Sequence, residues 1–207
     1  MKTGKKIFLD VGGHEGQTLN EVVKATYLFD EIYCFEPMPA QYDVLLKKFG
    51  HISNLKIMNY GLLNANTSQN IYGTNNDLGA SIYQNKSDLD NRNVSTMCNF
   101  IDVSEFFKEN ISENDTVIMK LNCEGSETLI LSSLIESKEI FKIDNVMIDF
   151  DVRKIVGHQH EEHEVMDKFK QINFSNYSLE NTVMIGNSHE SRIGNWLNSL
   201  SFNLKSV

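Results

Sequence analysis

The sequence of 207 residues lacks several features that mark particular classes of protein. It has no excess of positive charge, because its formal net charge is -9, and so nothing attracts it generally to nucleic acid or anionic lipid. It also lacks a long hydrophobic run near its start, where Asp10 cuts the first apolar stretch short. We therefore expect no nucleic-acid substrate, no signal peptide and no membrane span.

Cysteine is scarce as well. Cys34, Cys98 and Cys123 are scattered in apolar, strand-like stretches and do not form the pattern of a disulfide framework. Buried free thiols suit a reducing compartment, so we expect a cytoplasmic protein. The sequence shows no internal repeat and no boundary between domains, and 207 residues can bury one sizeable core.

The most informative stretch is residues 6–16, an apolar run that Asp10 ends and that continues with Gly12, Gly13 and Gly16. This pattern is typical of a buried strand that turns sharply into a helix, where glycine lets a ligand approach the main chain. A dinucleotide turn has a glycine at the middle position, which here is His14. The carboxylate of Asp10 would repel a pyrophosphate but would suit a cofactor with positive charge, such as S-adenosylmethionine.

A second apolar stretch, residues 31–36, ends in Glu36 and is stopped by Pro37. An acidic residue at the end of the second strand of a βαβ unit, about twenty residues after the glycine turn, accepts hydrogen bonds from a ribose diol. A solvated loop glutamate is the alternative, but the glycine turn favours the ribose ligand. Between these stretches, the apolar spacing of residues 17–29 predicts a crossover helix.

A third group of polar residues ends the strand predicted from residue 116 onward. Lys120, Asn122 and Glu124 follow each other at period two, which predicts that they share one face of the strand. Ligands of open α/β sheets bind outside the carboxyl ends of strands, so these side chains are expected near Glu36. A structural ion pair between Lys120 and Glu124 is the alternative.

Three motifs, residues 8–16, 35–39 and 120–127, resemble in this order and spacing the FkbM family of S-adenosylmethionine-dependent methyltransferases. The resemblance implies a class I, Rossmann-like fold and methyl transfer to a hydroxyl oxygen, often on a sugar or a secondary metabolite. It also implies that the glycine turn binds the methionine end of the cofactor, Glu36 the ribose and Met38 the adenine.

The predicted cofactor-binding residues are Asp10, Gly12, Gly13, His14, Gly16, Glu36, Pro37, Met38 and Asn122. The chain departs from the family at Asn122, where the family usually has aspartate. An amide can orient a cofactor ammonium or a substrate hydroxyl, but it cannot act as a base. Glu124 is the nearby carboxylate that can.

Three histidines within six residues, His158, His160 and His163, follow the predicted fifth strand. A neutral histidine near an acceptor hydroxyl is a general base with a suitable pKa, and His158 and His160 lie closest to the strand end. We therefore predict a histidine as the base, with Glu124 orienting the acceptor or pairing with Lys120. His160 and His163 would share a helix face, but a solvated helix start explains them equally well, so no metal is expected.

The predicted fold is an α/β, mostly parallel seven-stranded sheet with helices on both faces and an antiparallel closing strand. Residues 174–179 and 182–185 are the expected closing pair of strands. Residues 191–200 form an amphipathic tail helix that packs on its own sheet or in a homodimer. The single domain is expected to comprise a cofactor-binding half (1–62), an irregular β insertion (63–102) and a substrate-side half with a C-terminal helix (103–207).

The predicted function is S-adenosylmethionine-dependent O-methyl transfer to a small molecule or sugar. One alternative is a NAD-dependent oxidoreductase or epimerase, which Asp10 and the missing middle glycine oppose. The other is a catalytically inactive, methyltransferase-like binding protein, which Asn122 leaves open.

Overall fold

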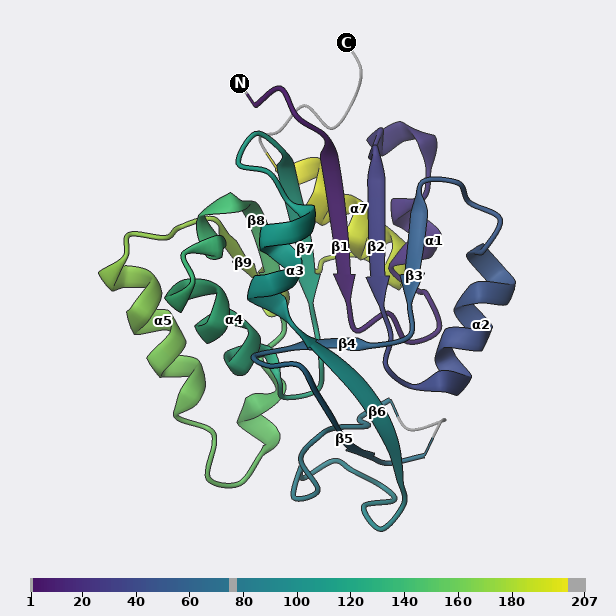
Figure 1. Ribbon diagram of the computed structural model, residues 1–207, viewed down its shortest axis with the longest axis vertical. Helices are drawn as coiled ribbons and strands as arrows, with labels where there is room; N and C mark the ends of the chain where they lie inside the picture. The colour runs from purple at the N-terminus through teal and green to yellow at the C-terminus, as the bar shows by residue number, and fades with distance from the viewer. Residues whose placement is uncertain (1, 75–77, 201–207) are drawn as a thin grey trace.

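The computed structural model describes residues 2–74 and 78–200, so residues 75–77 and 201–207 of the predicted segments lie outside it. Its centre is a six-stranded sheet with the order β3-β2-β1-β7-β8-β9, in which every neighbouring pair is parallel (Figure 1). The strands are β1 (Lys6–Val11), β2 (Glu31–Phe35), β3 (Leu55–Met58), β7 (Thr116–Leu121), β8 (Ile143–Ile148) and β9 (Tyr177–Leu179).

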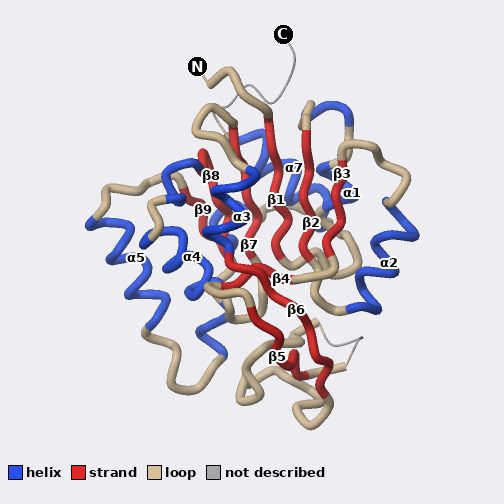
Figure 2. Tube along the Cα trace, in the orientation of Figure 1, coloured by secondary structure: helices blue, strands red, loops and turns tan. Residues whose placement is uncertain are grey.

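Helices cover both faces of this sheet (Figures 1 and 2). One face carries α1 (Leu19–Val22), α2 (Pro39–Phe49) and α7 (His189–Ser199); the other carries α3 (Val103–Asn110), α4 (Glu127–Glu136) and α5 (Glu161–Gln171). Both faces are covered because successive side chains of β1 point to opposite faces of the sheet. Ile7 and Leu9 pack in the hydrophobic cluster under α3, α4 and α5, and Phe8 packs in the cluster under α1, α2 and α7. A strand buried on both faces needs the continuous apolar run seen in the sequence.

The strand order reverses between β1 and β7. From β1 the chain moves outward through β2 and β3, and it then returns to the other side of β1 to form β7, β8 and β9. The loops that leave the carboxyl ends of β1 and β7 therefore diverge, which opens a crevice at this edge of the sheet.

A second, three-stranded sheet lies beyond that carboxyl edge (Figures 1 and 2). It consists of β4 (Gly61–Leu63), β5 (Thr67–Tyr72) and β6 (Ser95–Asp102) in the order β4-β6-β5, with β5 and β6 antiparallel. Most of it falls within residues 63–102, the predicted insertion. Its position places the insertion over the crevice.

The prediction of a seventh, antiparallel closing strand is wrong for the described residues. Residues 174–179 contain β9, but it pairs in parallel with β8. Residues 182–185 overlap a one-turn helix, α6 (Glu180–Val183). A two-residue hairpin needs positive φ, which neither Glu180 nor Asn181 adopts, so the chain turns into a helix after β9 instead of folding back.

The crossover helix predicted for residues 17–29 is also much shorter than expected. Only α1 and a short 3₁₀ helix, η1 (Ala25–Tyr27), are helical. Lys24 between them is extended, with φ -65° and ψ 134°, and Leu28 is left-handed with φ 53°. The glycine turn therefore leads into a single helical turn.

The C-terminal helix α7 packs on its own sheet. Ile193, Trp196 and Leu197 are buried, and the indole N–H of Trp196 donates to Oδ1 of Asn145 at 3.2 Å. The apolar face of α7, for which the sequence left open packing in a homodimer, is thus covered by the chain's own sheet. In the described parts of the chain, no helix has both the length and the apolar character needed to cross a membrane.

Candidate functional site

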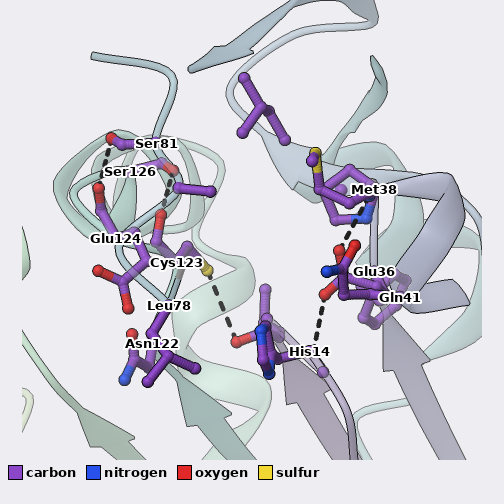
Figure 3. Close-up of a pocket in the computed structure, with 18 of the residues that line it drawn as sticks. His14, Glu36, Met38, Gln41, Leu78, Ser81, Asn122, Cys123, Glu124 and Ser126 are labelled. Atoms are coloured by element: carbon purple, nitrogen blue, oxygen red, sulfur yellow. Dashed lines mark hydrogen bonds between the residues drawn. The ribbon is translucent and has the colours of Figure 1, made fainter. Parts of the chain in front are cut away.

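A cavity of about 390 Å³ lies at the carboxyl ends of β1, β2 and β7, where the strand order reverses (Figure 3). Its size falls in the usual range for small-molecule sites. Nine of the predicted site residues line it: Gly12, Gly13, His14, Glu36, Pro37, Met38, Lys120, Asn122 and Glu124. Four others, Asp10, Gly16, His158 and His160, are not part of its lining.

Glu36 is the carboxylate on the β2 side of the cavity. One oxygen accepts the main-chain N–H of His14 at 2.7 Å, and the other accepts that of Met38 at 2.9 Å (Figure 3). Burial raises the pKa of Glu36 to about 7, against the lowering effect of these two hydrogen bonds. The carboxylate is thus fixed in direction, and its charge changes near neutral pH.

Gly12 brings the turn after β1 into contact with the turn after β7. It adopts φ +87°, and a Cβ at this position would lie 1.9 Å from the main-chain oxygen of Asn122. The amides of Gly12 and Gly13 both donate to the main-chain oxygen of Phe35. Only glycine fits so close an approach, which explains part of the motif read from the sequence.

Asp10 does not face the cavity, contrary to the prediction that it binds the cofactor directly. It is fully buried beside Lys120, with 3.3 Å between Oδ1 and Nζ. Burial raises the pKa of Asp10, and the attraction of Lys120 opposes this rise. Lys120 also donates to the main-chain oxygen of Gly12 at 2.7 Å, so it supports the glycine turn, and it lines the cavity, which Asp10 does not.

The turn after β7 differs from the predicted extended strand. β7 ends at Leu121, and Glu124 adopts a left-handed conformation with φ 56°, so Lys120, Asn122 and Glu124 do not follow one strand face. The buried carboxylate of Glu127 holds the turn by accepting the amides of Cys123 at 2.7 Å and Gly125 at 3.1 Å. The positive φ of Glu124 is unfavourable for a residue with a side chain, and such strained residues cluster at functional sites.

Glu124 lines the cavity, and it does not form the ion pair with Lys120 that the sequence left open as the alternative. Its Oε2 lies 2.7 Å from Nζ of Lys86, a residue of the insertion. Its main-chain oxygen accepts the hydroxyl of Ser81 at 2.6 Å (Figure 3). Burial and the nearby carboxylate of Asp151 raise the pKa of Glu124 to about 8.

Asn122 takes the place of the expected aspartate on the cavity wall. Its amide nitrogen donates to Oδ2 of Asp149 at 3.3 Å. Its side-chain oxygen is buried, and no hydrogen-bond partner for it occurs among residues 2–74 and 78–200. An oxygen in this position can accept a hydrogen bond from a bound ligand.

The histidines after β8 are not brought to the cavity. His158 lies against the ring of Tyr83 and pairs with Glu161, 2.5 Å from its carboxylate. The side chains of His160 and His163 are 64% and 79% exposed. Within the part of the chain that the structure describes, no three His, Cys, Asp or Glu side chains converge in an arrangement suited to a metal ion.

Several residues of the cavity went unnoticed in the sequence. The insertion supplies Ile71, Leu78, Ser81 and Ile82 to its wall, and α7 supplies His189. The Asn- and Ser-rich sequence of the insertion predicts turns, but it does not predict that these turns cover a site.

His189 illustrates why such residues are hard to find. It stands at the start of α7, far along the chain from Thr18, yet its Nε2 lies 3.1 Å from the Thr18 hydroxyl. Burial lowers the pKa of His189 and of His14, the other histidine that lines the cavity. A lone histidine followed by an amphipathic helix gives no sequence signal of this contact.

Comparison with known proteins adds little to this geometry. No family model matches the chain, and no curated protein matches it. Among solved structures, the chain is similar to the crystal structure of methyltransferase FkbM from Methylobacillus flagellatus KT, with 13% sequence identity and a TM-score of 0.45 over 79% of this chain. The match spans 37% of that protein's length.

Proposed function

We propose that the chain is an S-adenosylmethionine-dependent methyltransferase that acts on a hydroxyl group of a small molecule or sugar. The observation that carries this proposal is the carboxylate of Glu36. It lies on the cavity wall at the carboxyl end of β2, next to the reversal of strand order, and two main-chain amides orient it. A carboxylate in this place is suited to accept hydrogen bonds from a ribose diol.

The residues on the wall fit this cofactor at two further points. Met38 is buried beside Glu36, and its polarizable thioether suits contact with a purine ring. The buried side-chain oxygen of Asn122 is free to accept a hydrogen bond from an ammonium group. In this arrangement Asn122 does what the sequence prediction assigned to Asp10.

A dinucleotide fits the same wall less well. A pyrophosphate needs a close glycine approach and the amides at the start of a helix. Here the middle position of the turn is His14, with φ 46°, and α1 is a single turn of four residues. These features favour a cofactor with one nucleoside over NAD.

The chemistry of the site follows from the groups around the acceptor. S-adenosylmethionine supplies an electrophilic methyl group when it is bound. The chain has to align a hydroxyl, accept its proton as the bond forms and limit the access of water. Glu124 is the carboxylate on the wall that suits the proton acceptor, and Ile71, Leu78 and Ile82 of the insertion cover the cavity with apolar surface.

Calorimetry with S-adenosylhomocysteine and with NAD tests the cofactor. We expect S-adenosylhomocysteine to bind and NAD to give no heat; the opposite result would support the oxidoreductase alternative. A mass spectrum of ligands released from the denatured protein provides an independent check. An acceptor screen with isotopically labelled S-adenosylmethionine then tests catalysis, and binding without transfer to any hydroxyl compound would favour the inactive, binding-only alternative that Asn122 leaves open.

A further inference from the structure

Lys86 is the most deeply buried lysine side chain near the cavity, although it does not line the cavity itself. Its side chain is 0% exposed, and its Nζ lies 2.7 Å from Glu124, 2.7 Å from Asp88 and 3.6 Å from Asp151. It also donates to the main-chain oxygen of Gly79 at 3.3 Å. A buried ammonium needs such partners, and one of the three carboxylates it binds faces the cavity.

This lysine belongs to the insertion, which is fastened to the segment after β8. The amide of Ser87 donates to the main-chain oxygen of Lys154 at 2.8 Å, and Lys86 forms an antiparallel bridge with Ile155. Lys154, at the end of the 3₁₀ helix η3 (Asp151–Lys154), lies 2.9 Å from the carboxylates of both Asp88 and Asp151. The ion pairs therefore link the insertion to η3 and to the turn after β7.

The backbone of that turn is fixed from two sides before Lys86 is considered. Ser81 holds the main-chain oxygen of Glu124, and Glu127 holds the amides of Cys123 and Gly125. The remaining freedom is the direction of the Glu124 side chain, which carries the charge. Lys86 is the cation in direct contact with it.

We propose that Lys86 is a positioning residue of the candidate site, which fixes the Glu124 carboxylate at the cavity wall and keeps it able to accept a proton. Lys86 acts through Glu124, because it does not itself line the cavity. The role in proton acceptance rests on the proposed function. The contact between the insertion and the turn after β7 does not.

The groups around Glu124 determine the sign of the effect. Lys86 and Asp151 act on Glu124 directly, and Cys123 is its neighbour in the turn. Asp88 binds Lys86, Lys154 binds Asp151, and Glu127 accepts the amide of Cys123, so these three groups act on Glu124 through its neighbours. Burial raises the pKa of Glu124, and so does Asp151, because its carboxylate accepts a hydrogen bond from the protonated form of Glu124 and repels the ionised form; the ammonium of Lys86 lowers it. Loss of Lys86 therefore raises this pKa further, since an opposite charge at this distance typically shifts a carboxyl by about 1–3 units.

A carboxyl-carbon NMR titration of protein labelled with ¹³C at glutamate measures this directly, with the Glu124 signal assigned by its loss in Glu124→Gln. We expect the titration midpoint of Glu124 to rise by roughly one unit or more in Lys86→Met. Lys86→Gln, which keeps hydrogen-bonding capacity and serves if the methionine variant does not fold, should shift it in the same direction. Lys86→Arg keeps the charge and should leave the midpoint nearer to that of the unmodified protein.

Lys142→Met is the matched control. Lys142 is also largely buried and binds a carboxylate, Glu139, together with main-chain oxygens, but it lies at the amino end of β8, away from the cavity. It should lower stability without moving the Glu124 midpoint. A midpoint that is the same in the unmodified protein, Lys86→Met and Lys86→Gln would overturn the proposal.

The same samples separate this inference from the cofactor assignment. Calorimetry with S-adenosylhomocysteine tests the proposed function, because failure to bind even the unmodified protein would reject the cofactor. In that case the NMR midpoints would still decide whether Lys86 positions Glu124. If the unmodified protein binds S-adenosylhomocysteine, we expect Lys86→Met to bind it nearly as well. The reason is that Glu36 and Met38 lie across the cavity from Glu124, the residue that Lys86 contacts (Figure 3). A large loss of affinity together with an unmoved midpoint would indicate a general collapse of the wall instead of positioning.

Discussion

Asp10 and Lys120 face each other directly across the parallel pair of β1 and β7, and both are buried, with their charged atoms 3.3 Å apart. Asp10, which the sequence predicts as a cofactor ligand, therefore forms a buried ion pair with Lys120. Its carboxylate neutralises a lysine whose ammonium supports the Gly12 carbonyl. The pair contributes to the site by holding the glycine turn in place.

Removal of Lys120 alone should be costly, because it leaves the Asp10 charge buried without its partner. We expect Lys120→Met to lower the free energy of unfolding by about 3–5 kcal/mol. The double variant Asp10→Asn with Lys120→Met should recover part of this loss. Urea unfolding measures both, and Lys170→Met, which removes an exposed ion pair with Asp167, provides a control with little effect. A single variant no less stable than the double one would contradict the pairing.

Replacement of Glu36 tests the ribose contact. Glu36→Gln removes the charge from the hydrogen bonds to the ligand, so the affinity for S-adenosylhomocysteine should fall by about 1.5–3 kcal/mol, on the order of ten- to a hundredfold. Calorimetry measures the change. Glu31→Gln is the matched control, because Glu31 lies at the other end of β2, bonded to Lys5 and Tyr33, and should leave the affinity unchanged. Equal affinity in both variants would remove the ribose assignment.

The same carboxylate predicts a pH dependence. Because burial raises the pKa of Glu36 to about 7, only its ionised form, which grows as the pH rises, can accept the two ribose hydroxyls. Affinity for S-adenosylhomocysteine should therefore increase as the pH rises through about 7 and level off above about pH 8. His14, His189 and Glu124 also titrate around the cavity, so the deciding comparison is with Glu36→Gln, in which the rise should disappear.

Two glycines with nearly the same positive φ separate the cost of that φ from the cost of crowding by neighbouring atoms. Gly12 and Gly157 adopt φ +87° and +91°, but a Cβ at Gly12 would meet the main-chain oxygen of Asn122 at 1.9 Å, whereas one at Gly157 would meet nothing within 4 Å. Gly157→Ala should cost only the left-handed conformation, about 1–2 kcal/mol. Gly12→Ala should cost more and also weaken ligand binding. Thermal unfolding and calorimetry of the two variants decide, and equal losses would show that the close approach to β7 is unimportant.

The parts of this fold that the sequence predicts well are those in which one local rule decides the outcome. The apolar run and glycine turn of residues 6–16 give β1 and its turn, because burial on both faces and positive φ leave few alternatives. Helix α3, Val103–Asn110, follows a similarly local rule, because Asp102 caps its start by accepting the amides of Ser104 and Glu105. The position of Glu36 follows from the same kind of rule.

The parts that were missed depend on contacts between distant segments. Lys86 and Ser81 are ordinary polar residues in an Asn-rich stretch, and their role exists only because the insertion folds onto the turn after β7. The histidines showed the opposite error. His158 and His160 have suitable chemistry close to a strand end, yet Glu161 pairs with the first and the solvent surrounds the second. Sequence proximity to a strand end does not fix the direction of a side chain.

The identity of the proton acceptor is the prediction that the structure changes most. Glu124 lines the cavity, and burial and Asp151 raise its pKa to about 8, whereas His158 and His160 lie outside the cavity lining. A general base of this kind typically contributes about 10²–10⁴ in rate. Once the acceptor screen has supplied a hydroxyl substrate, Glu124→Gln should lower turnover by such a factor and leave S-adenosylhomocysteine binding nearly intact.

His158→Ala and His160→Ala are the matched comparisons, and both should retain turnover close to that of the unmodified protein. The pH profile adds a second criterion, because a rate that needs ionised Glu124 should rise with pH through about 8 and then level off. If either histidine variant loses turnover while Glu124→Gln keeps it, the original histidine prediction is right, and the carboxylate serves only to orient the acceptor.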